Sequence, residues 1–171
     1  HIISFLDPKE TSYFHNFYSN AMITSIVKAE ENQYLTVFLK RAEQSSAVLQ
    51  AIVTAGGIMI GGSDADECKR TKIVKTLKMI DGLLLDPNPQ DYIDAMMSYI
   101  ILMEGHIVNN CVADWEYLFE LVKQYVRQLG LYDRLCNGRE FLQLLDDEKW
   151  IAVNLTHHDL HSSLVNVKGT F

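Results

Sequence analysis

Hydrophobic residues in this chain recur mostly at the three- and four-residue spacing of an α-helix, and the alternation typical of a β-strand is scarce. The segment after Pro89 is apolar around most of its circumference, which predicts a central, buried helix. A later segment has one apolar face and ends at Gly130. That face consists of Trp115, Leu118, Phe119, Val122, Val126 and Leu129. Ile151, Val153 and Leu155 alternate over too few residues to establish a strand, so the pattern predicts an all-α protein.

Several short segments carry the residues that start or interrupt helices. Asp7-Pro8-Lys9-Glu10 places an acid at the cap, proline at the first helical position and glutamate where a capping box needs it. Asn88-Pro89 repeats the cap and the proline. The pairs Gly56-Gly57 and Gly61-Gly62 weaken helices, so we expect a turn or hinge there. Ser63 is expected to cap the helix that follows.

Prolines and glycines also divide the chain into parts. Asp86-Pro87-Asn88-Pro89 is the hardest break, because a residue that precedes proline resists the helical conformation. With the glycine pairs, it isolates one central helix. We therefore predict two small helical bundles joined by a linker that includes a basic amphipathic helix. The bundles cover residues 1–62 and 89–171, and the linker helix covers residues 63–88.

The central helix concentrates positive charge. The formal charge of the whole chain is −7, yet five of its 15 basic residues lie close together, and the ten bases and 22 acids outside this window sum to −12. At about 100° per residue, the apolar Ile73, Leu77, Ile80 and Leu84 share one face, and the opposite face carries Lys72, Lys75 and Lys78. Such a face predicts an anionic partner, either phosphate, a lipid headgroup or an acidic protein; a solvated outer surface is the alternative. The five residues are Lys69, Arg70, Lys72, Lys75 and Lys78.

Candidate chemistry is sparse elsewhere. The three cysteines are far apart, which excludes a disulfide framework or a zinc knuckle and favours buried free thiols. His157, His158 and His161, with Asp159, form a candidate metal cluster, but nothing else supplies the coordination shell, so a surface histidine cluster is the better interpretation. No phosphate loop and no nucleophile–histidine pattern has supporting context. We therefore expect no enzymatic activity, no cofactor and no bound metal.

The order of the segments is also informative. An apolar turn leads into the first helix, and an amphipathic helix and an apolar helix follow. A short acidic loop then precedes the basic helix, and a leucine-rich end leads to the proline-rich break. The segments that carry this order are Ile2–Leu6, Phe38–Arg41, Ala47–Ala55, Cys68–Val74 and Asp86–Asp91. Over about residues 2–105, in order, spacing and residue class, the chain resembles the orthomyxovirus matrix protein family. It is similar to the influenza-type matrix proteins as a divergent, thogotovirus-like member.

The resemblance implies a viral structural matrix protein without enzymatic activity. Such a protein self-assembles into an oligomeric layer beneath the viral envelope, and it bridges the anionic lipid membrane and the viral ribonucleoprotein or RNA. The implied locations are the virion, the host cytoplasm, the inner membrane surface and the nucleus. The implied contact residues for membrane and ribonucleoprotein are Lys69, Arg70, Lys72, Lys75 and Lys78.

Two alternatives come from other classes of protein. One is a helical adaptor, similar to small Bcl-2-like viral or cellular interaction proteins, that binds a protein partner through an apolar groove. The other is a metal-dependent hydrolase that uses the histidine cluster. A matrix protein needs its basic helix to face outward, an adaptor needs an exposed apolar groove, and a hydrolase needs bound metal.

Overall fold

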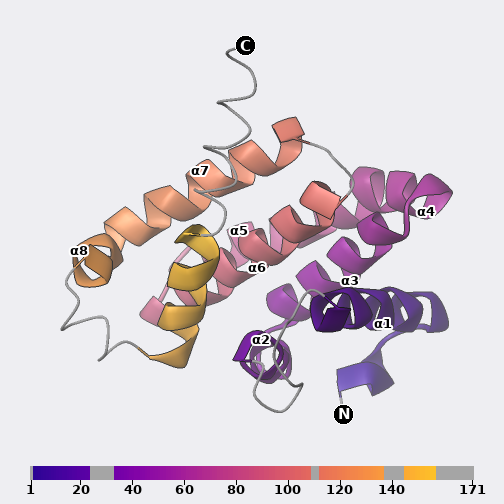
Figure 1. Cartoon of the computed structure of the whole chain (residues 1–171), viewed down its shortest axis with the longest axis horizontal. Coiled ribbons are helices and arrows are strands. Elements are labelled where there is room, and N and C mark those ends of the chain that lie inside the picture. Colours follow the sequence, from indigo (N-terminus) through magenta and orange to yellow (C-terminus); the bar gives the residue numbers. More distant parts are fainter. Residues whose placement is uncertain (1, 24–32, 109–111, 137–144, 157–171) are drawn as a thin grey trace.

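The computed structural model describes residues 2–23, 33–108, 112–136 and 145–156. Nearly all of these residues are helical and none is in a β-strand, which confirms the predicted all-α class (Figure 1). No described helix is long and apolar enough to cross a membrane. The elements are a 3-10 turn (Ile2–Phe5), α1 (Pro8–Ile23), α2 (Gln33–Ala42), α3 (Ser46–Ile60), α4 (Gly62–Glu67), the π-helix η3 (Cys68–Lys72), α5 (Ile73–Leu83), α6 (Pro89–Val108), α7 (Val112–Gln128), α8 (Leu131–Cys136) and a helix over 146–156.

The predicted helix starts are confirmed at α1 and α6. The backbone N–H of Glu10 donates to the Asp7 carboxylate over 2.8 Å, and the N–H of Asp7 donates back to the Glu10 carboxylate over 3.4 Å. Asn88 and Asp91 form the same reciprocal pair at α6, with Pro89 as the first helical residue. Each pair satisfies backbone donors that the first turn of a helix leaves unpaired.

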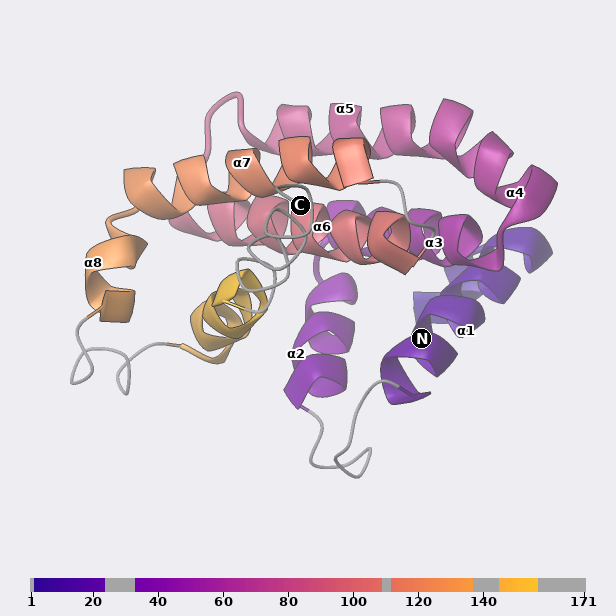
Figure 2. The ribbon, with the colours of Figure 1, turned by 45° about the horizontal axis from the view of Figure 1, so that its top comes forward.

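Helices α3 and α6 form the centre of the molecule. Figure 2 shows them in a middle layer, with α5 and α7 on one side and α2 on the other. Residues 51–58 of α3 are all buried, as are residues 93–103 of α6, which confirms the prediction of a central helix after Pro89. The apolar face predicted before Gly130 packs against this core from α7, and Gly130 lies just beyond the end of α7, with φ 61°. The alternating residues 151–155 lie in a helix.

The division into two helical bundles, over residues 1–62 and 89–171, stays a prediction. In the structure, α3 from the first range packs on α6 from the second, and their buried side chains belong to one contiguous core. The two helices approach closely at Gly105, where a Cβ atom would lie 2.9 Å from the Cα of Ala55. A side chain at Gly105 would therefore force α3 and α6 apart.

The two glycine pairs differ in their structural role. The prediction of a turn or hinge is wrong for Gly56 and Gly57, which lie inside α3. A Cβ atom on Gly56 would lie 1.9 Å from the carbonyl oxygen of Tyr13 in α1, so the glycine permits close helix packing. The second pair does form a turn, since Gly61 and Gly62 have φ of 84° and 57°. Gly61 also occupies the cap position of α4, so the prediction that Ser63 caps this helix is wrong.

Candidate interaction surface around α4 and α5

The basic segment runs through η3 into α5. In η3 the N–H of Ile73 donates to the carbonyl of Cys68, five residues earlier, which widens this turn of the helix. Cys68 is fully buried, and burial raises the pKa of its thiol, as expected for an unreactive structural cysteine. Its Sγ lies where a side chain on Gly57 would be, 2.3 Å from the position of that Cβ. The wide turn therefore lies directly against α3.

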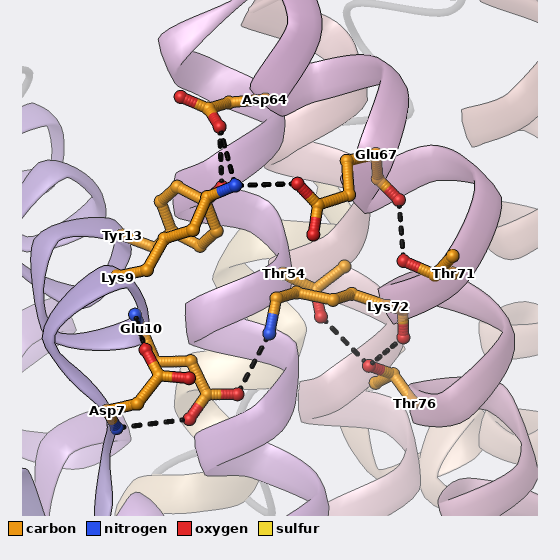
Figure 3. A network of polar contacts seen from close by, with 10 residues as sticks. All are labelled: Asp7, Lys9, Glu10, Tyr13, Thr54, Asp64, Glu67, Thr71, Lys72 and Thr76. Carbon is orange, nitrogen blue, oxygen red and sulfur yellow. Dashed lines mark hydrogen bonds and ion pairs between the residues drawn. The ribbon is translucent and has the colours of Figure 1, made fainter.

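Lys72 turns back toward α1. Its Nζ lies 2.8 Å from a carboxylate oxygen of Glu10, and the two side chains are only 18% and 16% exposed (Figure 3). The prediction that Lys72 shares an outward face with Lys75 and Lys78 is wrong for Lys72. Residues three apart differ by about 60° around a helix. The three lysines therefore spread over about 120°, and α1 covers the edge where Lys72 lies.

Lys9 joins α1 to α4. Its Nζ lies 3.0 Å from Asp64 and 2.6 Å from Glu67, and the hydroxyl of Tyr13 donates to Asp64 over 2.9 Å (Figure 3). The hydrogen bonds to Glu67 and Asp64 raise the pKa of Lys9, and the bonds from Lys9 and Tyr13 lower the pKa of Asp64. With the Lys72–Glu10 pair, these contacts hold α1 against the start of the basic segment.

A buried pair of hydroxyls joins α3 to α5. The Oγ1 atoms of Thr54 and Thr76 lie 2.9 Å apart, and both residues are fully buried. Thr76 also donates to the carbonyl of Lys72 over 2.8 Å. Because each polar atom has a partner, these hydroxyls pack inside the core without the cost of an unsatisfied group. The inner face of α5 therefore packs against α3, and the outer face of α5 is the one that a partner can contact.

The five predicted contact residues do not share one surface. Lys69 is half-buried, and the Nε atom of the exposed Arg70 donates to the carbonyl of Asp66 over 3.1 Å. Lys72 is engaged by Glu10, whereas Lys75 and Lys78 are exposed. Lys75 and Lys78 flank a shallow, open depression of about 400 Å³, which Thr71, Val74 and Met79 complete.

The sequence did not point to Lys9, Glu10, Tyr13 or Asp64 as part of this region. Glu10 was recognisable only as a capping residue, and it serves Lys72 as well. The described residues contain no group of three or more side chains able to hold a metal ion. The histidine cluster at residues 157–161 lies outside the described residues.

Tyr13 provides a test of this region by pH. Burial raises the pKa of Tyr13 to about 12, above the ordinary value of about 10. Because the folded state holds this proton more tightly, its contribution is complete below pH 10 and is lost as the pH rises from 10 to 12. Two pKa units correspond to a loss of about 3 kcal/mol. Urea unfolding at pH 9, 10 and 11 should show a steeper fall in stability for the wild type than for Tyr13→Phe, and equal slopes would contradict this origin.

Comparison with known families identifies the chain. The family described as the fungal specific transcription factor domain matches residues 11–171, which is most of the sequence. The chain belongs to this family. Neither the comparison with curated proteins nor that with solved structures gives a match.

The family corrects the resemblance to orthomyxovirus matrix proteins. The predictions of a virion location, a layer beneath an envelope, and contacts with anionic membrane and ribonucleoprotein are wrong for a fungal transcription factor domain. The Bcl-2-like adaptor has no support from this family either. The resemblance rested on the order of amphipathic helices and one basic helix. Amphipathic helices are common to all-α proteins, because burying one face of a helix with 3.6 residues per turn requires that pattern, so their succession along a chain does not identify a family.

Proposed function

We propose that this chain is a non-enzymatic regulatory domain of a fungal transcription factor and that it acts through contacts with other proteins. The observation that carries the proposal is the match of the family to residues 11–171. A transcription factor acts in the nucleus, and a regulatory domain can also receive its signal in the cytoplasm. The described helices pack into one core, which suits a scaffold that presents surfaces to partners.

Charge favours protein partners over direct contact with DNA. A DNA-binding domain normally carries a clustered basic surface, whereas this chain has a formal charge of −7. Its most basic segment has Lys72 engaged by Glu10 inside the molecule. A Zn₂Cys₆ module would need six cysteines, and the chain has three. These features support a role in regulation rather than in reading the DNA sequence.

A reporter assay tests the proposal. The chain, fused to a heterologous DNA-binding domain in a fungal host, should raise or lower expression of a reporter relative to the DNA-binding domain alone. The chain by itself should not retard duplex DNA in a gel at physiological salt, because the acidic surface repels phosphates. Reporter output equal to that of the DNA-binding domain alone would refute regulation, and tight binding of duplex DNA would refute the choice of protein partners.

A further inference from the structure

The outward face of α5 combines positive charge with exposed apolar surface. Figure 2 shows α5 along one edge of the molecule. Val74 is 46% exposed and Met79 is half-buried, and both line the depression together with Thr71. Val74 and Lys78 are four residues apart, as are Lys75 and Met79, and all four residues line the same hollow. An apolar hollow flanked by two ammonium groups has the chemistry to hold an apolar side chain and carboxylates together.

The positive charge of Lys75 and Lys78 is not neutralised within the described part of the chain. Ion pairs engage Lys9, Lys72 and Arg41, but none joins a carboxylate to Lys75 or Lys78. Exposed lysines alone would be unremarkable on a protein surface. The distinguishing feature is that these two flank exposed apolar atoms in a protein whose other residues sum to a strongly negative charge.

The extent of this surface decides what kind of partner fits. Asp66 is exposed in α4, ahead of η3, and Asp81 is exposed three residues after Lys78, near the end of α5. At 1.5 Å per residue the two acids lie roughly 20 Å apart along the segment formed by α4, η3 and α5. A membrane or a nucleic acid duplex extends beyond that span and would place its own negative charges near both acids. A short peptide segment can contact the basic stretch between them without meeting either.

We infer that this face docks an acidic segment of a protein partner, whose apolar side chain fills the hollow beside Val74 and Met79 while its carboxylates pair with Lys75 and Lys78. The inference rests on the proposed function, because it names the chemistry of one partner of the regulatory domain. Exposed ion pairs contribute little each, so the interaction is weak and reversible, with a dissociation constant on the order of 100 µM.

The test is a fluorescence anisotropy titration of the whole chain. The probe is a short labelled peptide of aspartate and glutamate interspersed with leucine and phenylalanine. Two control peptides replace either the acids by glutamine or the apolar residues by serine. We expect the acidic, apolar peptide to bind and both controls to bind at least about fivefold more weakly, and we expect 500 mM NaCl to weaken binding.

Matched variants assign the binding to this face. Lys75→Gln with Lys78→Gln should weaken binding about tenfold, and Val74→Ser about threefold. Lys40→Gln with Arg127→Gln removes the same charge from exposed positions on α2 and α7, and it should change binding less than twofold. Circular dichroism verifies that each variant is folded.

The outcomes separate this inference from the proposed function. Equal binding by wild type and the Lys75/Lys78 variant, or equal weakening by the Lys40/Arg127 control, would overturn the docking surface. So would tighter binding of phosphatidylserine vesicles or of a duplex oligonucleotide that depends on the same two lysines. A reporter effect that persists without any peptide binding would overturn only the inference, whereas the absence of a reporter effect would overturn the proposed function.

Discussion

Replacing Gly56 by alanine is expected to destabilise the protein by about 3 kcal/mol or to prevent folding. The new Cβ would lie 1.9 Å from the carbonyl oxygen of Tyr13, and no rotation of a side chain can relieve a clash with backbone. Helix α1 would have to move away from α3, which would also strain the hydrogen bond from the Asn16 amide to the carbonyl of Gly56. Alanine is a better helix former than glycine by about 1 kcal/mol, so the clash must exceed that gain.

Gly82 provides the matched control for this substitution. It lies inside α5, and beyond its chain neighbours and the backbone of its own helix a Cβ atom there would have no atom within 4 Å. Gly82→Ala should therefore stabilise the protein by about 0.5–1 kcal/mol, because only the helix propensity changes. Urea unfolding followed by circular dichroism measures both free energies. A Gly56→Ala variant as stable as Gly82→Ala would show that α1 is not closely packed on α3 at this point.

Replacing Asp94 by asparagine is expected to cost about 3 kcal/mol of folding free energy. The Nε of Arg41 in α2 lies 2.6 Å from the Asp94 carboxylate in α6, and both side chains are only 11% exposed. Removing the negative charge would leave the guanidinium largely buried without its closest partner. Asp147 lies 4.0 Å from Arg41 and would offset part of the loss, which places the cost at the lower end of the range for broken buried pairs.

Glu120 provides an isosteric control for Asp94. It pairs with Lys123 one turn along α7, and its side chain is 66% exposed. Glu120→Gln should change the free energy of unfolding by less than about 0.5 kcal/mol, since solvent screens an exposed pair. Unfolding of the two variants in urea, at the same pH, gives the comparison. Similar small losses in both would mean that the Arg41–Asp94 pair does not hold α2 against α6.

The identification of the family illustrates what helix patterns can specify. Hydrophobic periodicity reports that a segment is a helix and which face is buried, and both are properties of all-α proteins in general. The order of such helices therefore suggested a matrix protein although the chain belongs to a fungal transcription factor family. The same weakness applies to the basic helix, since clustered lysines on a helix are compatible with many partners.

Patterns along the chain are sufficient to predict features that depend on neighbouring residues or on a single helical face. The reciprocal caps at Asp7 and Asn88, the stop at Gly130, the buried α6 and the apolar face of α7 were all predictable. In each case, the interacting groups are at most four positions apart or share one helical face. Local propensity and periodicity are therefore sufficient to specify them.

Contacts between segments far apart in the sequence became evident from the three-dimensional arrangement of the helices. The pair Gly56-Gly57 suggests a hinge, because glycine weakens an isolated helix. The proximity of α1 in the structure shows instead that the small size of these residues permits close helix packing. The spacing along the helix predicts an outer position for Lys72, whereas in the structure its ammonium group pairs with Glu10, 62 residues earlier in the chain. The free energy of such a contact depends on the distance between two helices. The residue pattern along either helix carries no information on that distance.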